Sequence, residues 1–241
     1  MGTSPSQAPI QPLTRIAACS LSGNELKVLA AVSMVIDHMG VLFFPGAALP
    51  RILGRFAMPI FAFMIAQGCQ YTKNKRRYFG GVFLLALACQ LVYYFTTGST
   101  YQCILVTFSL SILLVFALQE GKQRGGIHWL LFPSMVAVVW GLNQMLTIDY
   151  GFWGCMLPVF ASLFQGNTHG LDRHPVHVLS MGVGLLILSV QFGWIQMFSL
   201  LTLPLLLLYS GRRGKYPMKA FFYVFYPAHL VCLEGLFLLL N

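Results

Sequence analysis

Charged residues are scarce in this sequence. Only 9% of its 241 residues are charged, six of them are acidic, and 57% are hydrophobic. A soluble domain is typically about a quarter charged. One soluble core cannot bury this many apolar side chains. The composition therefore predicts an all-α, polytopic helical membrane protein.

The sequence also lacks several motifs that would point to other classes of protein. Its six cysteines form no CxxC pair, and five lie in or beside apolar segments, so we expect no structural disulfide and no zinc site. No internal repeat is visible, which weakens a transporter interpretation. Residues 1–25 are polar and Pro-rich without an apolar core, so they predict a short tail rather than a signal peptide. Residues 26–241 then form a single transmembrane domain.

The apolar segments predict about nine spanning helices. Their approximate limits are 26–45, 56–72, 78–96, 103–119, 127–146, 150–164, 176–192, 194–210 and 219–240. The sixth is short, and the turn before the eighth is tight, so eight helices is an alternative.

The basic residues predict which way the chain crosses the membrane. A cytoplasmic N-terminus places 13 of the 15 basic residues in the cytoplasm: Arg15, Lys27, Lys73, Lys75, Arg76, Arg77, Lys122, Arg124, Arg173, Arg212, Arg213, Lys215 and Lys219. Only Arg51 and Arg55 fall on the far side. The positive-inside rule therefore favours a protein of the bacterial inner membrane with its N-terminus in and its C-terminus out. The run Lys73–Arg77 is typical of a segment that contacts anionic lipid headgroups.

The first apolar helix contains ionisable residues where lipid is expected. Asp37 and His38 are adjacent, and a charge near the bilayer centre costs roughly 2.5–3.5 kcal/mol. Lys27 precedes His38 by eleven residues, or three helical turns, which places both on one face about 16 Å apart. A histidine near neutrality can exchange a proton or accept an acyl group on a ring nitrogen.

Asp37 points away from His38, so its partner should be a cation on another helix. Arg51 and Arg55 follow the first loop at i, i+4 spacing, and we expect one of them to pair with Asp37. Two plainer interpretations stay open. Asp37 and His38 could serve only to hold the bundle together, and the arginines could extend to the membrane interface.

Two further polar groups are candidates for the same cavity. Tyr223, Tyr226 and His229 lie on the last helix, which Pro227 should kink. His229 could line the cavity or be a core histidine, and the tyrosines could be interface aromatics. Asn143 and Asp149 lie near the outer ends of the fifth and sixth helices, where Asp149 could accept an amine or cap a helix. The histidines of the loop 165–177, His169, His174 and His177, together with Asp172, more readily fit a solvated loop than a metal site.

Four segments resemble one family of membrane proteins. LKVLAAVSMVIDHMG, RILGRFAMPIFAFMIAQG, DYGFWG and YVFYPAHL occur in this order between Leu26 and Leu230. They are similar to the TraX family patterns LKxIAxxxMxIDHxG, RxxGRxAFPxFxF, DYGxxG and FYPxHL. Met58 replaces the common Phe, and the loop 165–177 has no counterpart. The x10 spacing of Lys27 and His38 also resembles the [R/K]-x10-H motif of membrane acyltransferase-3 proteins, although their RxxR motif is absent.

The resemblance implies an acyltransferase. TraX proteins are known as pilin acetylases of conjugative systems, so this protein would move an acetyl group from acetyl-CoA to an amine such as a processed pilin N-terminus. His38 and Asp37 would be catalytic, while Lys27, Arg51 and Arg55 would bind the donor. The pantetheine arm of coenzyme A is about as long as the rise from Lys27 to His38, so a channel should open toward the cytosol at Lys27.

Two other functions remain open from the residues alone. A proton-coupled transporter would use Asp37 and His38 as a relay. A non-enzymatic assembly factor would hold pilin or another membrane peptide. None of the three requires nucleic acid or a metal.

Overall fold

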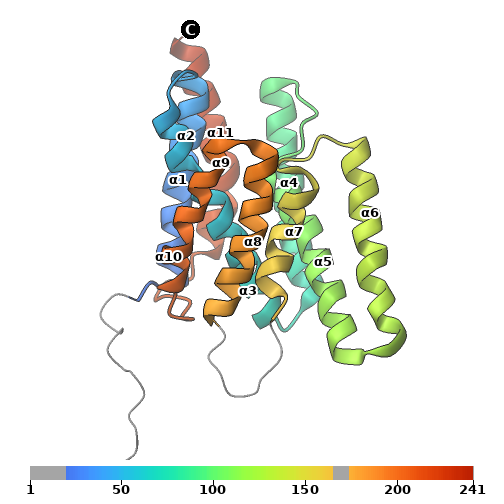
Figure 1. Ribbon diagram of the computed structural model, residues 1–241. Coiled ribbons are helices and arrows are strands. Elements are labelled where there is room, and N and C mark those ends of the chain that lie inside the picture. Colours follow the sequence, from blue (N-terminus) through green and yellow to red (C-terminus); the bar gives the residue numbers. More distant parts are fainter. Residues whose placement is uncertain (1–19, 165–173, 241) are drawn as a thin grey trace, which may run out of the picture.

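The computed structural model describes residues 20–164 and 174–240, which form a bundle of helices (Figure 1). Within these residues, seven helices are long and apolar enough to cross a membrane: Gly23–Phe43, Ala48–Tyr71, Lys75–Thr96, Ile104–Arg124, Gly126–Met145, His174–Phe192 and Ala220–Leu240. Two shorter apolar helices, Gly151–Ser162 and Trp194–Leu207, complete the set. Together they correspond to the nine predicted segments, with the short sixth as expected.

Several of these segments contain more than one helical element. The elements are α1 (Gly23–Phe43), α2 (Ala48–Gly54), α3 (Ala57–Tyr71), α4 (Lys75–Thr97), α5 (Ile104–Arg124), η2 (Gly126–Leu130), α6 (Leu131–Met145), α7 (Gly151–Ser162), α8 (His174–Phe192), α9 (Trp194–Met197), η3 (Phe198–Leu201), α10 (Thr202–Leu207) and α11 (Lys219–Leu240). The predicted helix 194–210 is thus α9, η3 and α10 in succession. Gly193, at φ 85°, separates it from α8, so these two segments are distinct helices, while the number of spans stays a prediction.

Local sequence explains where the first helices begin and break. Ser22 and Glu25 form a capping box at the start of α1, each side chain bonding the other's backbone N–H. The second predicted helix, expected from residue 56, begins earlier, at Ala48, and breaks at Arg55 and Phe56. The ring of Pro59 clashes with a helical carbonyl four residues before it, at Arg55, and this accounts for the break between α2 and α3.

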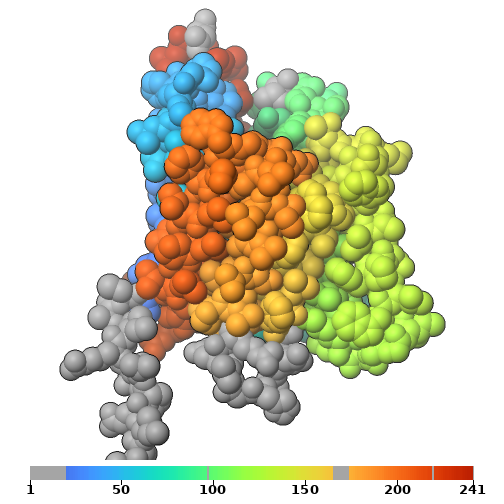
Figure 2. All heavy atoms as spheres, in the orientation of Figure 1, coloured from blue at the N-terminus to red at the C-terminus, as the bar shows by residue number. Residues whose placement is uncertain are grey.

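The surface of the bundle is apolar. In the spanning windows of α4, α6 and α11, only 11%, 6% and 17% of residues are buried. Side chains such as Phe95, Val190 and Leu239 are at least 80% exposed. Figure 2 shows the face covered by α8, α9 and α10, with α6 and α7 beside it. Soluble monomers rarely expose such large apolar areas, so these faces contact lipid and the protein is a multi-pass membrane protein.

Basic residues gather at one end of the bundle. Lys75 of α4 pairs with Glu120 of α5 at 3.6 Å, and Lys122 bonds the carbonyl of Ser162 at the end of α7. The start of α1 lies at the same end, where the Gly23 amide bonds the Arg212 carbonyl at 2.8 Å. Figure 1 shows α1 beginning at this end and α11 ending at the other. The basic residues gather at one end of the bundle, as predicted. Which side of the membrane this end faces stays a prediction.

Two of the loop histidines have structural partners. His174 bonds the Leu206 carbonyl at 2.9 Å, and His177 bonds the Ala161 carbonyl at 3.1 Å. These bonds tie the start of α8 to the ends of α10 and α7. His169 and Asp172, the other members of the possible metal group, lie outside the described residues.

Candidate active site

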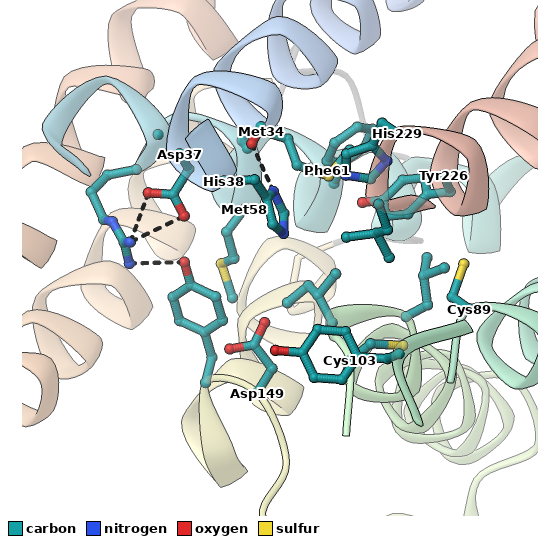
Figure 3. Close-up of a pocket in the computed structure, with 18 of the residues that line it drawn as sticks. Met34, Asp37, His38, Met58, Phe61, Cys89, Cys103, Asp149, Tyr226 and His229 are labelled. Carbon is teal, nitrogen blue, oxygen red and sulfur yellow. Dashed lines mark hydrogen bonds and ion pairs between the residues drawn. The ribbon is translucent and has the colours of Figure 1, made fainter. Parts of the chain in front are cut away.

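A cavity of about 320 Å³ lies inside the bundle (Figure 3). It lies toward the end of α1 opposite Lys27. Residues from α1, α2, α3, α4, α5, α8 and α11 and from the turn before α7 line it. Seven of the ten predicted site residues are among them: Asp37, His38, Arg51, Arg55, Asp149, Tyr226 and His229. Segments that are far apart in the sequence therefore meet in one polar cavity.

Asp37 pairs with both predicted arginines. Arg51 Nη1 donates to Asp37 Oδ1 at 2.8 Å, and Arg55 Nη2 donates to the same oxygen at 3.1 Å. The expectation that one of them would be the partner is confirmed. Two arginines and one carboxylate leave a net positive charge on this side of the cavity.

Arg55 connects Asp37 on α1 with Tyr150 in the turn before α7 and with Gln196 on α9. Its side chain is only 10% exposed, and Nη1 donates to the Tyr150 hydroxyl at 3.0 Å and to Gln196 Oε1 at 3.2 Å. Nε donates to the Arg51 carbonyl at 3.2 Å. Arg55 thus links α1, the turn before α7 and α9, so it is not an interfacial side chain in lipid.

Close backbone packing holds α1 against α2. A Cβ atom added at Gly54 would overlap Asp37, and one added at Gly40 would lie 2.6 Å from Pro50 Cβ. Only glycine allows the helices to approach this closely. The position of Asp37 beside Arg51 and Arg55 depends on this packing.

His38 lines the cavity, and among the described residues only one of its two ring nitrogens has a hydrogen-bond partner. Its Nδ1 lies 2.8 Å from the Met34 carbonyl. A carbonyl only accepts hydrogen bonds, so Nδ1 carries the hydrogen and Nε2 of the neutral ring has a lone pair. Figure 3 shows the ring directed into the cavity. An imidazole in this tautomer can act as a base or as a nucleophile.

His229 has the same arrangement on α11. Its Nδ1 lies 3.0 Å from the Phe225 carbonyl, and its ring centroid is 5.1 Å from that of His38, at an interplanar angle of 76°. Of the two earlier interpretations of His229, the cavity position is the one found. Tyr226, beside it, is 6% exposed and lines the cavity rather than an interface.

Asp149 faces the cavity from the turn before α7. It accepts a hydrogen bond from the Tyr101 hydroxyl at 2.8 Å, and burial raises the pKa of this carboxyl, although Tyr101 and Arg55 act in the opposite direction. The N-cap of α7 is Tyr150, whose backbone is left-handed with φ 57°. Such a conformation is uncommon outside glycine, and it places Tyr150 against Arg55. Asp149 therefore serves the cavity and is not the N-cap residue.

Three predicted site residues do not line the cavity. Lys27 lies near the basic end of α1, Asn143 Nδ2 donates to the Val139 carbonyl at 3.0 Å, and the Tyr223 hydroxyl packs over Gly81. The cavity-lining residue of α1 nearest to Lys27 is Met34, about 10 Å farther along the helix. Among the described residues, the cavity around His38 therefore does not extend to Lys27, and the expected channel stays a prediction.

Sequence reasoning missed several lining or supporting residues. These are Tyr101, Tyr150 and Gln196, together with the cavity-lining Cys89 and Cys103. Gln196 was detectable as a lone amide in an apolar segment, and Tyr150 lies within the DYGFWG motif. Among the described residues, no group of three or more metal-ligating side chains is present.

The fold and the cavity define a multi-pass helical membrane protein with an internal polar site. A model of the TraX protein family matches residues 22–237. The chain belongs to the TraX family, as the four motifs predicted.

Two curated proteins are similar to this chain. A protein of Dichelobacter nodosus with the name "Probable fimbrial assembly protein FimC, serogroup H1" is 24% identical over 250 residues, covering 90% of this chain and 97% of its own. "Uncharacterized protein RP591" of Rickettsia prowazekii is 28% identical over 126 residues, covering 52% of this chain and 49% of its own. No solved structure matches.

Proposed function

We propose that this protein is a membrane-embedded acyltransferase that moves an acetyl group from acetyl-CoA to an amine. The observation that carries the proposal is the His38 ring, which has a lone pair on Nε2 and lines a polar cavity inside an apolar bundle. Membership of the TraX family, which is associated with pilin acetylation, supports this chemistry. The fimbrial assembly name of one relative supports a pilus subunit as the class of acceptor.

The cavity is suited to the reacting ends of the two substrates. Its volume of about 320 Å³ is at the low end for small-molecule sites, so it can hold a thioester and an amine but not a whole coenzyme A. Arg51, which lines the cavity, would stabilise the oxyanion that forms when the thioester carbonyl is attacked, while Arg55, whose N–H groups already donate to protein groups, would hold Asp37 in position. His38 would act as the base or as the nucleophile in this step.

The phosphates of the donor would bind at the basic end, outside the cavity. Gly23 and Asn24, one turn before Lys27 on the same face, contact the loop 210–216 through the Arg212 and Tyr216 carbonyls. Lys27 therefore lies beside a loop that contains Arg212, Arg213 and Lys215, and within the described residues none of these four cations is in an ion pair. The proposal requires the segment between Lys27 and Met34 to open when the donor binds.

Purified protein in liposomes with labelled acetyl-CoA and a peptide amine tests this proposal. Release of free thiol with acetylation of the peptide, lost in His38→Gln, is the expected result. His128→Gln, which changes a histidine of η2 outside the cavity, is the control. Proton-coupled counterflow without any acyl-CoA would instead indicate a transporter. Peptide binding that survives His38→Gln, without any thiol release, would indicate an assembly factor.

A further inference from the structure

One ring nitrogen of His229 is buried without a hydrogen-bond partner among the described residues. This nitrogen is Nε2, and the residue is 7% exposed. A buried polar atom without a partner costs roughly 1–3 kcal/mol. Because this atom belongs to a cavity-lining residue, its partner is expected to be a group that enters the cavity.

The tautomer of His229 fixes what that group must be. Since Nδ1 donates to the Phe225 carbonyl, Nε2 of the neutral ring can only accept. The ring is held in place by Phe225, stacked at 5.2 Å, and by Tyr226, edge-on at 5.9 Å. Neighbouring His38 has the same tautomer and its ring lies edge-to-face with that of His229, so two imidazoles whose Nε2 atoms can only accept line the cavity side by side (Figure 3). A ligand that satisfies both must carry N–H or O–H donors.

The proposed reaction removes two protons from the acceptor nitrogen in successive steps, which gives each of the two acceptors a proton to take. At neutral pH an alkyl amine is an ammonium, and the overall change is R–NH3+ plus acetyl–S–CoA to R–NH–acetyl, HS–CoA and H+. The C–N bond forms and the C–S bond breaks. Of the two protons that leave nitrogen, one ends on sulfur and the other is released. With two histidines, the first proton can stay on one ring while the other ring takes the second proton.

We propose that His229 is the base that takes the first proton from the acceptor's ammonium, which leaves His38 for the acyl-transfer step. This role rests on the proposed function and specifies the acceptor as a protonated amine rather than an alcohol. The amine nitrogen gains its lone pair beside His38, where it attacks the thioester carbonyl. His229 releases its proton to water after the product leaves.

Few other titratable groups face His229. Helix α11 packs against α1 and α4. The titratable residues that line the cavity are Asp37 and His38 on α1, and Cys89 and Tyr93 on α4. Tyr226 is the nearest titratable residue on α11 itself. The only acid among them, Asp37, is bound by two arginines. Asp149, the other acid that lines the cavity, accepts a hydrogen bond from the Tyr101 hydroxyl, so His38 and His229 are the two bases that α1 and α11 contribute.

Two forms of one short apolar peptide test this role. One begins with alanine, whose amine is protonated at pH 7, and the other begins with trifluoroalanine, whose amine is neutral. In His229→Gln, we expect kcat/KM for the alanine peptide at pH 7 to fall about 10-fold, because only about a tenth of an α-amine with a pKa of about 8 is neutral at that pH. The trifluoroalanine peptide should lose only a few-fold, and raising the pH should restore the rate on the alanine peptide.

Equal loss with both peptides in a folded variant, or no loss with either, would overturn the role of His229 alone. Wild-type protein that acetylates neither peptide would overturn the proposed function and this role with it. Trp-fluorescence melting in detergent confirms folding, and His128→Gln is the control. If the glutamine variant does not fold, His229→Asn retains a donor near Nδ1 and is tested in the same way.

Discussion

Arg55 and Arg51 bind the same carboxylate but should differ in what they contribute to stability. The Arg55 side chain is 10% exposed and also donates to Tyr150 and Gln196, whereas the Arg51 side chain is 34% exposed. Removing one partner of a buried ion pair typically costs about 3–5 kcal/mol, and an exposed pair contributes about 0–1 kcal/mol. Arg51 remains to neutralise Asp37 when Arg55 is lost, so the lower value applies.

We therefore expect Arg55→Met to destabilise the protein by about 3 kcal/mol, or about 6–12 °C in Tm. Arg51→Met should cost less than about 1 kcal/mol. Thermal melting in detergent, followed by tryptophan fluorescence, measures both. Double-mutant cycles with Asp37→Asn should give a coupling energy of about 2 kcal/mol for Arg55 and under about 1 kcal/mol for Arg51. Equal couplings, or a larger one for Arg51, would refute the reasoning.

Three further perturbations test other parts of the account. Lys27→Ala should raise the KM for acetyl-CoA several-fold with little change in kcat, and an unchanged donor KM would remove Lys27 from the donor site. Gly54→Ala should abolish activity and lower Tm by several degrees, since the new methyl group overlaps Asp37; a fully active variant would contradict the close packing. The raised pKa of Asp149 means that the folded protein binds its proton more tightly than the unfolded chain does. Stability should thus fall as pH rises from the ordinary value of 3.8 through the raised one, and Asp149→Asn, measured as Tm against pH, should flatten that decline.

The helices and one contact of the site could be predicted from the sequence. A long apolar segment predicts a lipid-embedded helix whatever its packing partners are. The nine predicted segments therefore match the observed helices except at their ends. The contact between Asp37 and the arginines followed because an ionised group inside an apolar bundle needs a counter-charge. Arg51 and Arg55 were the available cations across a short loop.

The rest depends on packing that no short pattern encodes. The break before α3 arises from Pro59 acting on Arg55, and it turns Arg55 toward Tyr150, 95 residues later in the chain. The left-handed backbone of Tyr150 and the approach of Gln196 likewise result from tertiary structure. Lys27 and His38 lie on one helix, α1, as predicted, but within the described residues the cavity around His38 reaches only as far as Met34 on this helix.

Acetylation of a peptide amine by the reconstituted protein tests the central claim most directly. Intact-mass spectrometry of the alanine peptide after incubation with acetyl-CoA should show the addition of one acetyl group with wild-type protein. His38→Gln should give none while it melts like the wild type. Equal acetylation by folded His38→Gln would contradict the account.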